Sequence, residues 1–210
     1  MTVPPDATAP PYSFLSLGDS YTIGERVPET DRWSVQLASL LRKDGVDIAD
    51  PDIIARTGWT TAELQDAIKS RGNQKTYSLV SLLIGVNNQY REQSQDRYRA
   101  EFRELLATAT KFAGGNARHV FVLSIPDWGA SPFAAGRNKA TTAQEIDQFN
   151  AIASDECQKA GITFIDITPL SRSVAGDNSQ FASDGLHYSG KQMRGWAEKA
   201  LPVVKALMKK

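Results

Sequence analysis

Residues 77–88 read YSLVSLLIGVNN, an almost unbroken apolar run that ends in a glycine, a valine and two asparagines. A continuous apolar run is typical of a central strand in a parallel sheet, because helices cover both of its faces. A second run of this kind, HVFVLSI, occupies residues 119–125. The two runs predict the middle of an α/β sheet.

Shorter apolar runs at residues 12–17, 52–56 and 162–167 predict three further strands, and longer segments with helical periodicity separate the strands. This alternation is typical of a parallel sheet with right-handed crossovers. We therefore expect a three-layer α/β/α sandwich around a five-stranded parallel sheet in the flavodoxin-like order 2-1-3-4-5. Because no repeat or linker divides the 210 residues, we expect a tail at residues 1–11 and a single domain at residues 12–210.

Local signals indicate several helix ends and one loop. A Ser or Thr followed three residues later by Glu or Gln is typical of a helix N-terminus. The pattern occurs in Thr60 with Glu63, Thr142 with Glu145, and Ser189 with Gln192. We expect a kink or break before Pro202, which lacks a backbone N–H. Residues 126–140 (PDWGASPFAAGRNKA) are rich in Gly and Pro, which predicts a surface loop beside the sheet.

Composition and charge disfavour several classes of protein. Lysine plus arginine and aspartate plus glutamate each number 24, so no net field attracts nucleic acid or an anionic membrane. The one cysteine, Cys157, excludes an internal disulfide framework and a multi-cysteine metal site. No apolar run approaches the roughly 20 residues that span a bilayer. We expect a monomer without metal or cofactor.

The first eleven residues lack a basic stretch followed by an apolar one, so they do not read as a signal peptide. We expect a cytoplasmic protein, or an exported one whose leader is absent from this sequence.

Polar residues directly follow the first four predicted strands, and a further polar stretch lies past the fifth strand, just before the last predicted helix. The stretches are GDS at 18–20, RTG at 56–58, GVNN at 85–88, PDW at 126–128 and DGLH at 184–187. In an open parallel sheet the carboxyl ends of the strands form the edge at which ligands bind. Reactive residue types from distant parts of the chain are therefore expected to converge on one edge.

Four of these stretches resemble the conserved blocks of the GDSL/SGNH hydrolases. GDS near the N-terminus, an isolated glycine after the second strand, GxN after the third and DxxH near the C-terminus occur in the family's order. Two positions depart from the usual pattern: Tyr21 stands where leucine is usual, and Asn88 stands where aspartate is common. Neither residue has to take part in the chemistry. With Asn88 in place of aspartate, the sequence does not fix the hydrogen bonds around Asn87.

The resemblance implies that Ser20 is a nucleophile, that His187 is its general base and that Asp184 orients the histidine. It also implies an oxyanion hole made of the Ser20 and Gly58 backbone amides and the Asn87 side chain. The chemistry agrees, since a serine hydroxyl needs an adjacent base and the oxyanion needs preorganised donors. We expect Ser20 Oγ within hydrogen-bond reach of one His187 ring nitrogen, with Asp184 facing the other.

Other residues compete for the roles of general base and orienting carboxylate. His119 opens the fourth predicted strand, so it belongs at the opposite edge of the sheet. Asp127 also follows a strand and rivals Asp184, whose short spacing to His187 we prefer. Asp19 is expected to make a structural hydrogen bond.

Four side chains near the strand ends are candidates for contacting substrate: Tyr21, Trp59, Asn88 and Trp128. Tyr90 and Phe133 also lie near strand ends or in the long segment. Such aromatic rings can stack on a sugar or line an acyl groove, although simple packing explains each of them equally well.

The resulting hypothesis is a serine esterase that cleaves carboxylic esters through an acyl-serine intermediate, with small acyl or acetylated carbohydrate esters favoured. A lysophospholipase or thioesterase activity and a catalytically silent binding module on the same scaffold are the alternatives. The G-x-S-x-G elbow of α/β-hydrolases and Gly-rich phosphate loops are absent from the sequence.

Overall fold

A computed structural model describes residues 12–209, so the predicted tail at residues 1–11 lies outside the described part. Five parallel strands form one sheet in the order β2-β1-β3-β4-β5, which confirms the predicted topology. The strands are β1 (Phe14–Gly18), β2 (Asp52–Ala55), β3 (Leu79–Leu83), β4 (Val120–Leu123) and β5 (Thr163–Ile165). Each lies within a predicted apolar run or differs from it by one residue, because the apolar runs continue into the adjoining turns.

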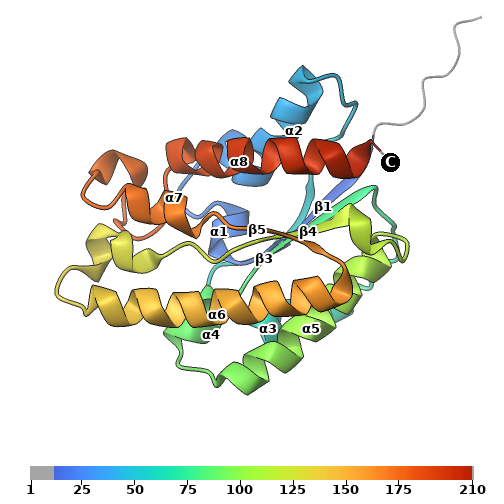
Figure 1. The fold of residues 1–210 in the computed structure, drawn as a ribbon. Coiled ribbons are helices and arrows are strands. Elements are labelled where there is room, and N and C mark those ends of the chain that lie inside the picture. The colour runs from blue at the N-terminus through green and yellow to red at the C-terminus, as the bar shows by residue number, and fades with distance from the viewer. Residues whose placement is uncertain (1–11, 210) are drawn as a thin grey trace, which may run out of the picture.

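Helices cover both faces of the sheet. They are α1 (Ser20–Ile23), α2 (Trp33–Lys43), α3 (Thr61–Arg71), α4 (Val86–Tyr90), α5 (Gln95–Phe112), α6 (Lys139–Ala160), α7 (Thr168–Ser173) and α8 (Gly190–Met208). Figure 1 shows α2 and α8 on one face and α3, α5 and α6 on the other, with the sheet between them. The three-layer α/β/α sandwich is therefore confirmed.

The central strands are the most deeply buried part of the molecule. Every residue of β3 and β4 is buried, as their continuous apolar sequences predict. The polar Ser81 of β3 satisfies its hydroxyl by donating to Ser16 Oγ of β1 at 3.0 Å. A rigid, fully covered sheet centre is what holds the strand ends in fixed relative positions.

Helix boundaries follow the capping signals in part. The box at Thr60 is confirmed, since its hydroxyl accepts the Glu63 N–H and the Glu63 carboxylate accepts the Thr60 N–H. The box at Thr142 is wrong, because Asn138 caps α6 and the helix begins at Lys139. Ser189 is the N-cap residue of α8, so the predicted helix start is confirmed, but its side chain makes no capping hydrogen bond and the box itself does not form.

The predicted interruption of the last helix does not end it, because α8 continues through Pro202. Residues on both sides of the proline are buried, among them Ala200 and Val204. Burial of this face compensates for the hydrogen bond that proline removes, a loss of about 3 kcal/mol in an exposed helix. No helix among residues 12–209 is long and apolar enough to cross a membrane.

The segment 126–140 is only partly the surface loop that its composition predicts. It forms two short 3-10 turns, Trp128–Ala130 and Pro132–Ala134. The first turn is buried, and most residues from Ala135 onward are exposed. An indole ring and small side chains allow the first half to pack against the sheet end, which the count of Gly and Pro does not reveal.

Candidate active site

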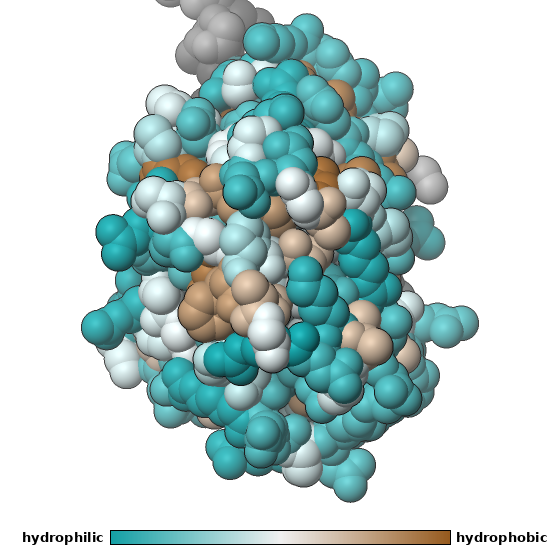
Figure 2. Space-filling view, turned by 90° about the vertical axis from the view of Figure 1, so that its left-hand side faces the viewer, coloured by the Kyte–Doolittle hydropathy of each residue, from teal (hydrophilic) through white to brown (hydrophobic). Residues whose placement is uncertain are grey.

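The carboxyl ends of the strands open onto one face of the molecule, where apolar side chains interrupt a largely hydrophilic surface (Figure 2). A cavity of about 190 Å³ lies at this edge, and Ser20, Gly58, Asn87 and His187 all line it. Four stretches from distant parts of the chain therefore meet, as expected from the strand ends. A larger cavity of about 360 Å³ between α3 and α5 is lined by lysines and amides and contains neither of the histidines.

Ser20 is the first residue of α1, a single helical turn that follows β1. The Asp19 carboxylate caps this turn by accepting the Tyr21 N–H at 3.0 Å, the structural role expected for it. Within residues 12–209 the Ser20 N–H has no hydrogen-bond partner, as is usual for the first donors of a helix. Burial raises the pKa of Asp19 to about 7, against the lowering effect of the backbone N–H that it accepts.

His187 and Asp184 are held together by a tight turn. Asp184 Oδ1 accepts the backbone N–H groups of Leu186 and His187, both at 3.0 Å, and Gly185 supplies the positive φ of +67°. Asp184 Oδ2 lies 2.6 Å from His187 Nδ1. Partial burial opposes ionisation of Asp184, but the hydrogen bonds from His187 and the turn hold its pKa below the usual value.

Ser20 and His187 line the same cavity and are 5 % and 9 % exposed. The hydrogen bonds among residues 12–209 do not include one between the Ser20 hydroxyl and the His187 ring. Such contacts are often long without substrate and tighten when it binds. With Asp184 on Nδ1, the ring nitrogen left for Ser20 is Nε2.

Gly58 and Asn87 contribute two further groups to the cavity. Gly58 has φ +86°, a conformation that favours glycine, and its N–H has no hydrogen-bond partner within the described residues. Asn87 Nδ2 donates to the Trp59 carbonyl at 2.9 Å. Because an asparagine amide has two N–H donors, one remains for a ligand.

Two of the four candidate substrate contacts line the cavity. Tyr21 does so, although its buried ring also packs against His187 with ring centroids 6.0 Å apart. Trp128 lines the wall, and its indole N–H donates to Gln89 at 2.8 Å. Both rings are therefore fixed by packing as well as placed beside Ser20.

The structure does not place the other two candidates, Trp59 and Asn88, at the cavity, and their contact with substrate stays a prediction. Within the described chain neither is among the residues that line the cavity, and Asn88 is fully buried. The Asn88 side chain accepts the Thr61 N–H at 3.2 Å and donates to the Thr61 hydroxyl at 2.6 Å. The Trp59 carbonyl accepts the hydrogen bond from Asn87, while the Trp59 side chain packs against the core.

Several other lining residues were not among the four candidates for contacting substrate. These are Thr57, Val86 and Leu186, and Tyr90 and Phe133 join them from the aromatic set named above. Thr57, Val86 and Leu186 lie inside the strand-end stretches RTG, GVNN and DGLH, so their positions in those stretches could have indicated them. The guanidinium of Arg137 lies 5.4–5.6 Å from the centres of the Tyr90, Trp128 and Phe133 rings. No sequence signal indicated that contact, because Tyr90 is distant in sequence from the other three residues, which lie in the segment 126–140.

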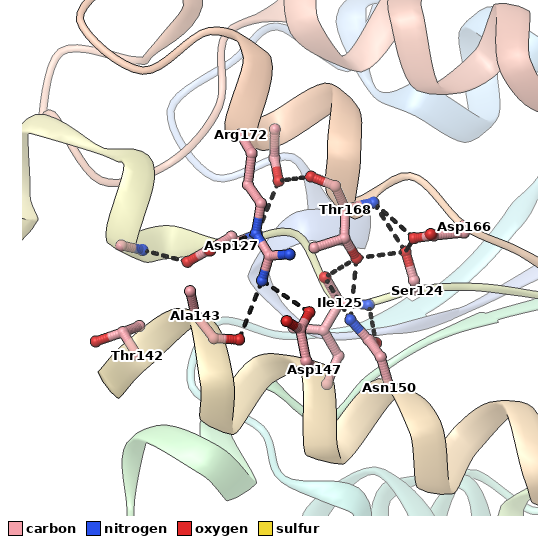
Figure 3. A network of polar contacts seen from close by, with 12 residues as sticks. Ser124, Ile125, Asp127, Thr142, Ala143, Asp147, Asn150, Asp166, Thr168 and Arg172 are labelled. Carbon is pink, nitrogen blue, oxygen red and sulfur yellow. Dashed lines mark hydrogen bonds and ion pairs between the residues drawn. The ribbon is translucent and has the colours of Figure 1, made fainter. Parts of the chain in front are cut away.

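Asp127 belongs to a polar network that anchors the cavity wall (Figure 3). Its carboxylate accepts the Gly129 N–H at 2.8 Å and the Arg172 guanidinium at 2.8 Å. Asn150 of α6 pairs with both backbone groups of Ile125, at 2.8 and 3.1 Å. The network joins the end of β4 to α6 and α7, so Asp127 is engaged away from His187. His119 lies immediately before β4, at the opposite edge of the sheet.

Solved structures with this fold include several hydrolases. The crystal structure of TesA superposes with a TM-score of 0.72 at 17% identity, covering 93% of this chain and 99% of that one. Axe2, an acetylxylan esterase from Geobacillus stearothermophilus, gives 0.71 at 17% identity, covering 92% and 94%. The esterase EstA from Pseudoalteromonas gives 0.61 at 14% identity, covering 94% of each chain. At these identities the likeness shows the fold alone.

The strand order and the four strand-end blocks define a hydrolase of the SGNH fold class. The chain belongs to the GDSL-like lipase/acylhydrolase family, whose sequence model matches residues 16–194. A comparison with curated proteins finds no match. Among the described residues, no group of three or more His, Cys, Asp or Glu side chains is arranged to hold a metal ion.

Proposed function

We propose that this protein is a serine esterase that hydrolyses carboxylic esters with a small acyl group. One observation carries the proposal: His187, paired with Asp184 at 2.6 Å, lines one cavity together with Ser20 and the Gly58 and Asn87 donors. A base held by a carboxylate, a hydroxyl and preorganised N–H groups are what acyl transfer requires.

In the first half of the reaction, Ser20 Oγ attacks the ester carbonyl carbon and its proton passes to His187 Nε2. The carbonyl oxygen becomes an oxyanion, which accepts hydrogen bonds from Ser20 N–H, Gly58 N–H and Asn87 Nδ2. Collapse of this intermediate breaks the bond to the alcohol oxygen, and His187 returns the proton to that leaving group.

In the second half, a water molecule attacks the acyl-serine while His187 takes its proton. The acid leaves and Ser20 regains its hydrogen. Asp184 holds the ring in the tautomer with Nδ1–H and stabilises the imidazolium that forms twice in the cycle. The neutral ring is the form of His187 that can accept the proton from the attacking group.

The cavity favours a small acyl group. Its volume of about 190 Å³ lies below the roughly 300–1,000 Å³ of pockets for drug-sized ligands, and Val86 and Leu186 make part of the wall apolar. A long acyl chain, as in a lysophospholipid or an acyl thioester, would extend beyond this volume. The exposed rings of Tyr90 and Phe133 at the cavity favour an alcohol with a broad face, and acetylated carbohydrates are one such class.

The test is a series of p-nitrophenyl esters from acetate to laurate, followed by acetylated xylo-oligosaccharides. We expect kcat/KM to be highest for acetate or propionate and to fall steeply with chain length. Ser20→Ala is the control and should be inactive. A fluorophosphonate should label Ser20 in the wild type. If Ser20→Ala retains wild-type turnover, the serine-esterase proposal is wrong, and an optimum at long chains would favour the lipase or thioesterase alternative.

A further inference from the structure

Three side chains hold the backbone of residues 58–61. Two of them belong to α4, and the third belongs to the residue directly after it. Asn87 binds the carbonyl of Trp59 at 2.9 Å, and Asn88 binds the backbone N–H of Thr61 at 3.2 Å. Arg91, directly after α4, donates from Nη2 to the carbonyl of Gly58 at 2.6 Å. The same short helix therefore carries one expected oxyanion donor, Asn87, and holds the segment that carries another, the Gly58 N–H.

The Gly58 turn needs such support. Residues 56–59 form a turn in which the Trp59 N–H reaches the Arg56 carbonyl at 3.3 Å, a long bond. Gly58 occupies the third position with φ +86°, as is typical of a type II turn. Arg56 and Thr57 are exposed. An exposed turn with a weak internal hydrogen bond does not by itself hold an N–H to the precision that transition-state binding requires.

Arg91 is itself anchored. Its Nη1 lies 3.2 Å from both carboxylate oxygens of Glu63, and Glu63 Oε2 accepts the Thr60 N–H at 2.8 Å. Partial burial of Glu63 opposes ionisation, yet the bonds from Thr60 and Arg91 lower its pKa. The Glu63 carboxylate thus caps the start of α3 and also orients the Arg91 guanidinium toward the Gly58 carbonyl.

We propose that Arg91 is a positioning residue for the oxyanion hole, acting through its bond to the Gly58 carbonyl with Glu63 as its anchor. The proposal rests on the proposed esterase function. Arg91 is not among the described residues that line the cavity, so it does not touch substrate. As an exposed ion pair, Arg91–Glu63 contributes little to stability, so a purely structural role predicts little effect of its loss.

The experiment compares Arg91→Met, Arg91→Lys and Glu63→Gln with the wild type on p-nitrophenyl acetate. The matched control is Arg194→Met, which removes another exposed Arg–Glu pair, on α8. We expect Arg91→Met to lower kcat about 10-fold with KM within about twofold, less than the 10²–10³ lost when a donor is deleted. Arg91→Lys should recover part of the loss, because lysine keeps the charge but cannot contact Gly58 and Glu63 in the same forked geometry.

A second measurement reports on the oxyanion hole itself. A trifluoromethyl ketone forms a tetrahedral oxyanion adduct with a reactive serine, so its Ki should rise by the same factor as kcat/KM falls in Arg91→Met and Glu63→Gln. Melting temperatures and the pH profile should stay unchanged. Because both variants act on one contact, the double variant should be little worse than Arg91→Met alone.

The outcomes separate this inference from the proposed function. An active wild type with an unchanged kcat and Ki in Arg91→Met overturns the positioning role alone, and so does an equal loss in Arg194→Met. A wild type that neither hydrolyses esters nor reacts with a fluorophosphonate at Ser20 overturns the proposed function and this inference with it.

Discussion

At the scale of single residues, the 2.6 Å contact between Asp184 and His187 sets the tautomer of the imidazole ring. Asp184→Asn replaces an acceptor with a group that can donate to Nδ1, which leaves the wrong nitrogen protonated. We expect kcat to fall by about 10⁴ with the fold intact, the scale known for Ser-His-Asp enzymes. Steady-state kinetics with circular dichroism as the folding control would check this, and retained turnover would exclude Asp184 as the orienting carboxylate.

A second prediction at this scale concerns the amide of Asn87, which has one N–H on the Trp59 carbonyl and one for the cavity. Asn87→Ala should reduce transition-state stabilisation by about 2.7–4 kcal/mol and leave Ser20 able to form some acyl-enzyme. The measurement is kcat/KM together with the yield of acyl-enzyme by mass spectrometry. A loss of less than threefold in kcat/KM would show that Asn87 is not an oxyanion donor.

At the scale of elements, the exposed rings of Tyr90, after the end of β3, and Phe133, in the segment after β4, flank the cavity. Their side chains are 45% and 42% exposed, so truncation should cost little stability. We expect Tyr90→Ala and Phe133→Ala to lower kcat/KM about fivefold for acetylated sugars relative to ethyl acetate, corresponding to about 1 kcal/mol of lost aromatic contact.

Tyr12 provides the matched control for these two variants. It is 47% exposed and precedes β1, at the opposite edge of the sheet. Tyr12→Ala should leave the ranking of ester substrates unchanged, and labelling of Ser20 by a fluorophosphonate should proceed in all three variants. An unchanged ranking in Tyr90→Ala and Phe133→Ala would show that the two rings do not contact the alcohol.

At the scale of the whole molecule, the buried Asp19 carboxyl couples stability to pH. Its pKa is about 7 in the folded protein, against 3.8 for the free group. Between these values the folded state binds the proton and the unfolded state does not, so this group's contribution to stability is present below pH 3.8 and is lost as pH rises through 7.

Asp19→Asn should remove that dependence while its side-chain oxygen can still accept the Tyr21 N–H. The difference in unfolding free energy between variant and wild type should therefore change by about 4 kcal/mol from pH 4 to pH 8, in favour of the variant at high pH. Urea denaturation of both proteins across this range measures it. A difference that stays constant with pH would show that Asp19 titrates in its ordinary range.

Much of this architecture can be read from local sequence. The five apolar runs indicated the strands, and the continuous runs of β3 and β4 reflect burial on both faces of a parallel sheet. The box at Thr60 marked the start of α3 because that capping interaction spans three residues. The same rule misplaced the start of α6, where Asn138 offered a competing cap four residues earlier than expected.

The sequence by itself determined the α/β class, the strands and the short blocks that gather at one edge of the sheet. Tertiary structure decided which neighbouring side chains enter the cavity and which hold its walls. Asn87 and Asn88 are adjacent, yet one lines the cavity and the other is buried against Thr61. The bond from Arg91 to Gly58 joins residues 33 positions apart. Local preferences act over a few residues, whereas such contacts depend on how α4 packs beside the turn after β2, which is settled when the sheet assembles.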